Sequence, residues 1–310
     1  MSHIAVLLLA LGGPDSVENV EPYLLDVRGG RPTSVELIEE IRERYRLTGS
    51  QSPVLGIMRE VASRLEDRLN AHGSERHLVS IGMRHWHPYI KDAYAELMAE
   101  PPDRLICICM APQYSALSIG AYVKKVEEAR AALGGAFPIS YVESWYRHPG
   151  LIQAIVENIR RALEKFPPDI RSTVPMIFTA HSLPERILQM NDPYPEQVQG
   201  TMQAVCAILG RVNARFAYQS QGRSDEKWLG PSVESMIEAL HREGHRHVLI
   251  APIGFLTDHL EVLYDVDIEF RRLAESKGMH LERIAMLNAA PPLITILASL
   301  IEEHRASLVG

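Results

Sequence analysis

The stretch Pro175–His181 (PMIFTAH) is a short apolar, β-prone run, Pro175–Ala180, with a histidine placed directly after it. Seven further runs of this kind recur along the chain, each separated from the next by a segment with helical patterning. They are Ile4–Leu9, Leu78–Gly82, Leu105–Cys109, Ile139–Val142, Phe216–Gln219, His247–Ala251 and Arg283–Leu287. Eight strands that alternate with helices indicate an α/β fold with parallel sheets.

The order of these segments is repeated in the two halves of the chain. In the first half a strand leads to His87–Ile90 and a helix through Leu97, and a second strand follows. In the second half a strand leads to Gly230–Val233 and a helix through Leu240, and again a strand follows. This duplication predicts two similar domains, each with a four-stranded sheet, and a cleft between them.

Composition narrows the classes of function. The 310 residues carry a formal charge of −7, and no cluster of Lys and Arg dominates, which argues against a nucleic-acid partner. Gly12-Gly13-Pro14 lacks the spacing of a dinucleotide fingerprint or a P-loop. Three cysteines cannot form a disulfide framework, and a reducing cytoplasm suits this usage.

Membrane and secretion signals are weak. No apolar run approaches the roughly 20 residues that cross a bilayer, so the protein could only lie against a membrane. The apolar start, Met1–Leu11, has no Lys or Arg before it and no cleavage site of the signal-peptide type, so it predicts a buried strand. Cys107 and Cys109 alternate within another strand and are expected to be buried core thiols rather than metal ligands.

In open parallel sheets, ligands bind beyond the carboxyl ends of the strands. His181 lies at such an end, which is typical of a functional-site residue. The alternative is a histidine that caps the helix expected around Pro184–Met190.

A second candidate is the acidic segment after the strand His247–Ala251. Its four carboxylates are three, four and four residues apart, which predicts that they share one face of a helix. They are Asp258, Glu261, Asp265 and Glu269, and the expected opposite face, Leu260, Leu263, Tyr264 and Ile268, is apolar. The pattern fits a solvated acidic face, and it also fits a path for cations or protons. A carboxylate with an imidazole suits ferrous iron.

Seven motifs resemble those of ferrochelatases, in that family's order and over nearly the whole chain. They are Ala10–Pro14 (ALGGP), Ser52-Pro53, Pro112–Ser115 (PQYS), Ala180–Glu185 (AHSLPE), Asp192–Pro195 (DPYP), Trp228–Pro231 (WLGP) and Asp258–Tyr264 (DHLEVLY). The resemblance implies two Rossmann-like domains, residues 1–145 and 146–288, with a porphyrin cleft between them. It also implies that residues 289–310 contain a helix, about Pro292–Leu308, that packs back on the first domain.

The resemblance implies roles for individual residues. His181 and Glu261 correspond to the inner metal-site and catalytic pair, and Asp265 and Glu269 to the rest of an acidic path for a second metal or for protons. Leu11, Arg28, Arg44, Tyr45, Ser52, Tyr114, Tyr122 and Trp228 correspond to porphyrin-binding positions, and Arg84 and His85 to a supporting pair. Guanidinium groups suit the propionate carboxylates of a porphyrin.

The porphyrin itself is left open by the sequence. Leu11 stands where many coproporphyrin-using relatives carry a tyrosine, and this favours protoporphyrin IX. The segment Val27–Arg31 and the pair Arg44-Tyr45 are more similar to the soluble coproporphyrin III group. The chain has no Cys-rich extension for an iron–sulfur cluster, so we expect no cofactor beyond the substrate Fe²⁺.

The resulting prediction is a cytoplasmic lyase of heme biosynthesis that inserts Fe²⁺ into a free-base porphyrin and releases two protons. A neutral His181 would ligate iron or accept a proton, and Glu261 would be the second ligand or acceptor. The alternatives are a chelatase for another divalent metal and a non-catalytic tetrapyrrole carrier. A carrier has little use for a paired imidazole and carboxylate.

Overall fold

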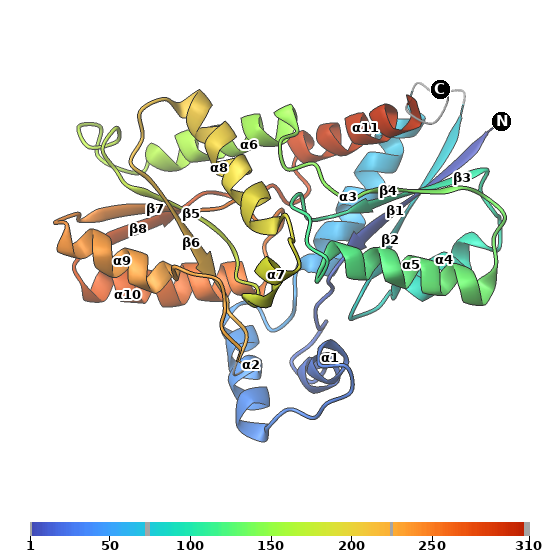
Figure 1. The fold of residues 1–310 in the computed structure, drawn as a ribbon, viewed down its shortest axis with the longest axis horizontal. Helices are drawn as coiled ribbons and strands as arrows, with labels where there is room; N and C mark the ends of the chain where they lie inside the picture. Colours follow the sequence, from blue (N-terminus) through green and yellow to red (C-terminus); the bar gives the residue numbers. More distant parts are fainter. Residues whose placement is uncertain (1, 72–74, 224–225, 307–310) are drawn as a thin grey trace. The chain divides into compact units, whose positions relative to one another are not determined.

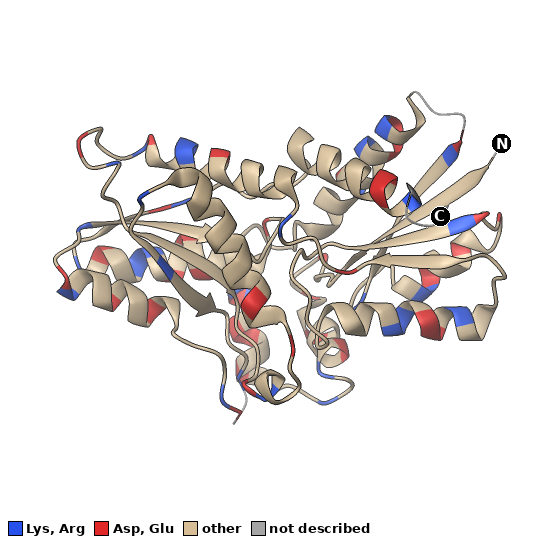
Figure 2. Cartoon of the chain, turned by 45° about the horizontal axis from the view of Figure 1, so that its top comes forward, with Lys and Arg blue, Asp and Glu red and all other residues tan. Residues whose placement is uncertain are grey.

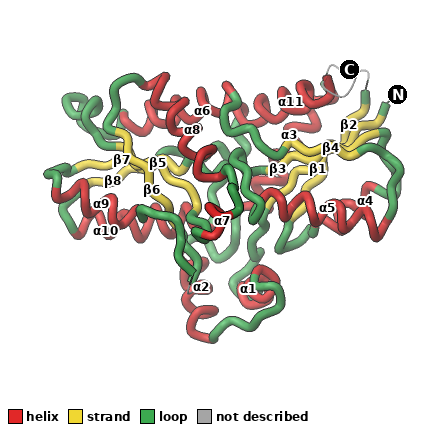
Figure 3. Tube along the Cα trace, in the orientation of Figure 1, coloured by secondary structure: helices red, strands yellow, loops and turns green. Residues whose placement is uncertain are grey.

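The computed structural model describes residues 2–71, 75–223 and 226–306. It divides into two compact units: Met1–Trp145 together with Asn288–Gly310, and Tyr146–Leu287. Each unit contains one four-stranded parallel sheet with helices on both faces (Figure 1; Figure 3). The strand orders, β2-β1-β3-β4 and β6-β5-β7-β8, are equivalent, so the prediction of two similar α/β domains is confirmed.

The first sheet is built around its most apolar strand. β1 (His3–Ala10) pairs with β2 (Arg76–Met83) on one side and with β3 (Arg104–Cys109) on the other, and β4 (Ile139–Val142) follows β3. The helices α3 (Val54–Asn70) and α11 (Pro291–Ala306) cover one face, and α4 (Ile90–Leu97) and α5 (Ile119–Leu133) cover the other (Figure 1). Two further helices, α1 (Val20–Val27) and α2 (Val35–Leu47), pack against each other.

The prediction that Cys107 and Cys109 are core thiols is confirmed. Both cysteines lie on β3 and are buried. They pack in one apolar cluster with Leu7 and Leu9 of β1 and with residues of α4 and α5, among them Tyr94. Burial raises the pKa of the Cys109 thiol to about 12, and it raises that of Cys107 as well. Neither thiol therefore ionises at neutral pH, which makes both unsuitable as nucleophiles.

The second sheet repeats this plan. β5 (Met176–His181) lies between β6 (Ala214–Gln219) and β7 (His247–Pro252), and β8 (His280–Arg283) follows β7. The helices α6 (Pro149–Leu163) and α8 (Tyr194–Leu209) cover one face, and α9 (Val233–Arg242) and α10 (Arg271–Ser276) cover the other (Figure 1). The short helix α7 (Arg186–Gln189) follows β5, and a π-helix, η1 (Glu261–Phe270), precedes α10.

The expected last strand, Arg283–Leu287, was placed wrongly. β8 ends at Arg283, and its four residues pair with His247–Ile250. Ile284, Met286 and Leu287 are buried although they lie outside the strand. A buried apolar run of this length has the same pattern as a strand, so the sequence could not separate the two.

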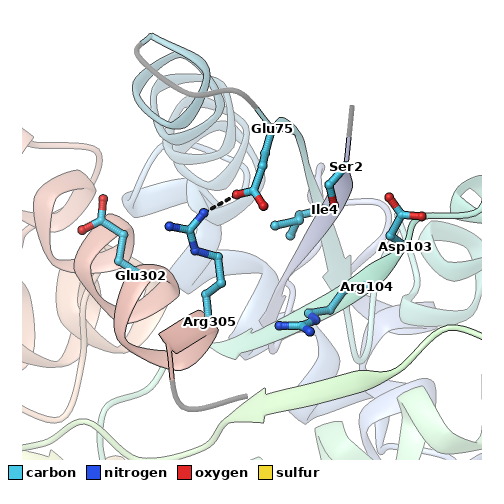
Figure 4. Close-up of a pocket in the computed structure, with 7 residues that line it drawn as sticks. All are labelled: Ser2, Ile4, Glu75, Asp103, Arg104, Glu302 and Arg305. Carbon is cyan, nitrogen blue, oxygen red and sulfur yellow. Dashed lines mark hydrogen bonds and ion pairs between the residues drawn. The ribbon is translucent and has the colours of Figure 1, made fainter. Parts of the chain in front are cut away.

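The helix α11 belongs to the first unit although it follows the second unit in the sequence. Leu293, Leu297 and Ile301 are buried on its inner side, and the guanidinium of Arg64 on α3 donates to the carbonyl of Ala289, at 2.9 Å. Near its other end, Arg305 forms an ion pair with Glu75 beside a hollow of about 590 Å³ (Figure 4). The expected helix end at Leu308 lies outside the described residues.

Candidate active site

The candidate site of the second unit lies at the carboxyl ends of its strands. His181 is the last residue of β5, and Glu261 is the first residue of η1, which begins after β7 has ended. The imidazole Nε2 of His181 lies 3.3 Å from Oε1 of Glu261, and the two side chains are 32% and 33% exposed. The structure therefore brings together the two residues that the sequence singled out, and leaves both accessible to a ligand.

The electrostatics of this pair are coupled. Burial acts to lower the pKa of His181, but the Glu261 carboxylate and the carbonyl of Ser182 outweigh burial and raise it to about 9. Burial likewise acts to raise the pKa of Glu261, but His181 and His259 outweigh it and hold that pKa well below its usual range. Without a metal, the pair is therefore an imidazolium–carboxylate ion pair at neutral pH.

The alternative role of His181 as a helix cap is wrong. Its Nδ1 contacts the carbonyl oxygen of Ser182, and its Nε2 faces Glu261. The residue that precedes α7 is Glu185. The backbone of His181 is held as well, because the hydroxyl of Tyr194 on α8 donates to its carbonyl oxygen at 2.8 Å.

A second histidine, His259, completes the surroundings of Glu261. Its Nε2 lies 3.4 Å from Oε2 of Glu261, and its Nδ1 lies 3.0 Å from the carbonyl oxygen of Thr257. We did not predict this residue as part of the site. Residues two apart do not share a helix face, and only the turn before η1 brings His259 next to Glu261.

The expectation that four carboxylates share one face of a helix is wrong for Asp258. This residue lies in the turn before η1, where its Oδ1 is 3.3 Å from a guanidinium nitrogen of Arg283. The other three carboxylates lie on η1 at steps of four residues. A π-helix takes more residues per turn than an α-helix, so a step of four falls just short of one turn and keeps them on one side.

The wider turn also moves the apolar face of this helix. The expected set Leu260, Leu263, Tyr264 and Ile268 is only half-buried. The buried apolar residues of η1 are Val262, Val266 and Phe270, and two of them, Val266 and Phe270, belong to the core cluster that includes α9. The apolar side is therefore next to the carboxylate side rather than opposite it.

Asp265 is held by a polar network at the end of β6. It is only 6% exposed, and the hydroxyl of Ser220 donates to its Oδ2. The amide of Gln219 donates to Ser220 Oγ and to the carbonyl oxygen of Glu261, at 3.3 and 3.2 Å, and accepts from Thr179. Glu269, by contrast, is exposed. Ser220 and Gln219 were not predicted, because only the pairing of β6 with β5 brings them to this place.

Trp228 lies beside His181. Its ring centroid is 6.5 Å from that of His181 with the planes at 54°, and it is half-buried. Gly222 lies against the ring, since a Cβ atom at that position would come within 2.5 Å of it. A side chain at Gly222 would therefore displace the indole.

In the first unit, three of the predicted residues, Leu11, Arg84 and His85, lie just after β1 and β2. Leu11 follows β1 and is 44% exposed. The backbone of Arg84 and His85 pairs with Ala10 and Leu11. The Nδ1 of His85 lies 2.8 Å from Oδ2 of Asp26, and burial holds the pKa of His85 below its ordinary value despite that carboxylate.

Several predicted porphyrin-binding side chains of this unit are largely buried. Tyr45, Ser52 and Tyr122 are 4%, 8% and 5% exposed. Ser52 packs on Gly13, where a Cβ atom would come within 2.4 Å of its hydroxyl, so this close approach requires glycine. Arg28, Arg44 and Tyr114 are half-buried, and Arg44 forms an ion pair of 2.9 Å with Glu40.

The charged side chains of both signs are mixed on the helices. Lys and Arg are interspersed with Asp and Glu over the helices (Figure 2). Within the described part of the chain, no helix is long and apolar enough to pass through a membrane.

Comparison with known proteins identifies the family. A family model described as Ferrochelatase matches residues 3–305 of this chain. The chain belongs to the ferrochelatase family. A ferrochelatase of Herpetosiphon aurantiacus is 38% identical over 297 residues, which is 96% of this chain and 97% of that protein. A coproporphyrin III ferrochelatase of Anoxybacillus flavithermus is 34% identical over 97% of this chain and 96% of its own length.

This ferrochelatase is thus an enzyme that inserts iron into a porphyrin in heme biosynthesis, as the sequence motifs predicted. Solved structures support the fold. SirB from Bacillus subtilis with Fe³⁺ matches with a TM-score of 0.62 at 10% identity, over 98% of this chain and 95% of that one. DR2241 from Deinococcus radiodurans, described as similar to chelatases, matches with a TM-score of 0.55 at 13% identity.

Proposed function

We propose that His181 and Glu261 are the catalytic pair of this ferrochelatase, and that they receive Fe²⁺ and take part in removing the two pyrrole protons. The observation that carries the proposal is the 3.3 Å approach of an imidazole nitrogen to a carboxylate oxygen at a strand end, with both side chains partly exposed. A nitrogen and an oxygen donor together suit ferrous iron. Arg84 and His85 are proposed as supporting residues.

The function is tested by anaerobic incubation with Fe²⁺ and each free-base porphyrin, followed by the loss of the free-base visible bands. Insertion of Fe²⁺ in preference to Co²⁺ supports the proposal over a chelatase for another metal. Binding of porphyrin without spectral conversion would instead indicate a carrier.

The same assay decides between the two porphyrins. A higher kcat/KM with protoporphyrin IX supports the assignment based on Leu11, whose leucine side chain cannot ligate iron. A higher kcat/KM with coproporphyrin III supports the assignment based on Arg28 and Arg44, since this substrate has more carboxylates for guanidinium groups to bind. Leu11, Tyr45, Ser52, Tyr114, Tyr122 and Trp228 are proposed to contact the macrocycle.

We expect metal binding to release a proton from the His181–Glu261 pair at neutral pH. With a pKa of about 9, His181 carries a proton at pH 7, and an imidazole must lose it before that nitrogen binds a metal. Apparent metal affinity should therefore rise with pH and level off above that value. Anaerobic calorimetry in buffers of different ionisation enthalpy measures the release, expected to be about one proton per ion.

The His181→Ala variant is the control for this measurement. It should bind the metal more weakly and with less proton release. Binding by the wild type without any proton release would show that the ion does not contact this imidazole.

We expect the double change Asp265→Asn and Glu269→Gln to raise the KM for Fe²⁺ several-fold, with little change in porphyrin affinity. Both residues follow Glu261 along one side of η1, so they are proposed to pass cations or protons. The measurement is the steady-state dependence on Fe²⁺ under anaerobic conditions. If these carboxylates only formed a solvated face, the double change would relieve like-charge repulsion of about 0.2–0.5 kcal/mol per pair of carboxylates and would leave the kinetics of iron insertion unchanged.

The melting temperature is the control for this double variant, because Asp265 is buried and accepts from Ser220. The single change Glu269→Gln, at an exposed position, separates transport from folding. Unchanged kinetics in a well-folded double variant would leave Glu261 as the functional carboxylate of η1.

We further propose that the enzyme acts in the cytoplasm and needs no resident cofactor beyond its iron substrate. The cysteines support this proposal, since Cys107 and Cys109 are buried inside β3 and the pKa of Cys206 on α8 is raised by burial. Thiolates that ligate a cluster need the opposite environment. Metal analysis of the purified protein tests this part of the proposal.

A further inference from the structure

The strand β2 forms one edge of the first sheet, and its outer side is only partly closed. The backbone groups alternate in direction along this edge. The N–H of Arg76, at the start of β2, donates to the carbonyl oxygen of Ser2, and that of Arg84, just after β2, donates to the carbonyl oxygen of Ala10, whereas the N–H and carbonyl oxygen of His77 face away from β1. The side chain of Asn70 on α3 pairs with both outward groups of His77, donating to its carbonyl oxygen and accepting from its N–H, each at 2.9 Å. This end of the edge is therefore blocked.

Two further outward N–H groups of β2 are also paired, one close to His77 and one at the carboxyl end of the strand. The carboxylate of Glu66 on α3 accepts from the N–H of Val79 at 2.7 Å. The N–H of Met83 donates to the carbonyl oxygen of Pro88. In the part of the chain that the structure describes, no group pairs with the carbonyl oxygen of Val79 or with the outward N–H and carbonyl oxygen of Ile81.

Val79 and Ile81, which carry these three backbone groups, line a groove of about 740 Å³. Its walls come from α3, with Arg59, and from α4, with Asp92 and Glu96. With Asp15 and Glu66, the groove carries four carboxylates against one guanidinium, and the exposed imidazole of His87 lies 3.9 Å from Asp92. An unpaired strand edge is a template for another strand, and the charge determines which strand fits.

We propose that this groove binds a short, extended, Lys- and Arg-rich segment of a partner protein, which adds to β2 as a further strand. The segment would donate to the carbonyl oxygens of Val79 and Ile81 and accept from the N–H of Ile81, as in other cases of strand addition. Successive side chains point to opposite faces of a strand. Alternate basic residues therefore face Asp92 and Glu96 on α4.

The charges and the blocked ends also determine what the groove excludes. A second copy of this chain, paired through its own β2, would bring like carboxylates together, and the repulsion disfavours it. A long strand cannot extend past Asn70 at one end or Pro88 at the other. The open edge therefore fits a short basic segment and does not favour indefinite edge-to-edge association.

The test uses the full chain and a fluorescein-labelled peptide of alternating Lys and Val, followed by fluorescence anisotropy at low salt. The wild type should bind it saturably. The double change Asp92→Lys and Glu96→Lys should weaken binding at least tenfold. The matched control is Glu234→Lys with Glu238→Lys, which makes the same charge change at the same spacing on an exposed face of α9 and should leave binding unchanged.

Main-chain pairing is tested separately from charge. A peptide with N-methylated amides at alternate positions keeps its charge but loses donors, and it should bind at least tenfold more weakly. The protein variant Ile81→Pro removes the outward N–H without removing a bond to β1, because proline is tolerated where an edge N–H faces outwards. If this variant does not fold, the N-methylated peptide gives the same information.

Three outcomes would overturn the proposal. They are no saturable binding by the wild type, equal weakening by the α4 and α9 charge variants, and undiminished binding of the N-methylated peptide. Iron insertion is the independent readout, and the variant at Asp92 and Glu96 should keep it, because neither residue belongs to the proposed site. Failure of this docking proposal is thus distinguishable from failure of the proposed function.

Discussion

The His181→Ala protein should fold, bind porphyrin and insert no measurable iron. The imidazole lies at a strand end and is a third exposed, so its removal leaves no closed cavity in the core. The change deletes the nitrogen that faces Glu261 and that would bind the metal or accept a proton. The measurements are the anaerobic loss of the free-base bands and the quenching of tryptophan fluorescence by porphyrin.

A matched control for this variant is His259→Ala. His259 is also a histidine paired with Glu261, at 3.4 Å, but it is less exposed than His181. We expect it to lose less activity, because it supports the carboxylate from the other oxygen. Near-normal activity of His181→Ala would show that His181 is not a catalytic residue. Equal losses in the two variants would show that the charge around Glu261 matters rather than a particular role of His181.

The Glu261→Gln protein should lose at least about a hundredfold in kcat, the scale of removed general acid–base help. Glutamine keeps the volume and the hydrogen-bonding capacity of the side chain. The change removes the negative charge of Glu261. This charge raises the pKa of His181, and it would also bind Fe²⁺. Steady-state kinetics with both substrates measure the loss, and porphyrin binding should be nearly unchanged.

Glu269→Gln is the matched control for that change, since it alters the same residue type in the same way further along η1. Its effect on kcat should be small. A Glu261→Gln variant that stays within several-fold of the wild type would contradict a role in catalysis and would leave His181 to act alone.

Much of the fold could be predicted because parallel strands leave a strong pattern. Ile4–Leu9 and Leu105–Cys109 are buried on both faces of their sheet, and such strands read as continuous apolar runs. The same reasoning failed at Ile284–Leu287, where Ile284, Met286 and Leu287 are buried although they lie outside the strand β8. His181 was recognisable as a site residue because it follows a strand directly, and that position depends on local sequence alone.

The remaining parts of the site depend on geometry that local sequence does not carry. The sequence contains no signal for the π-helix, so the burial of Val262 and Val266 was missed. Ser220 and Gln219 reach Asp265 and Glu261 only because β6 lies beside β5. His259 reaches Glu261 through a turn. The cleft between the two units stays a prediction.

The membership of α11 in the first unit has a consequence for the chain as it leaves the ribosome. The first unit lacks this helix until residues 291–306 have been synthesised, after the whole of the second unit. At ordinary elongation rates, this delay is on the order of ten seconds. During that time the apolar surface that Leu293, Leu297 and Ile301 later cover is open to chaperones, whereas the second unit already has all its own elements.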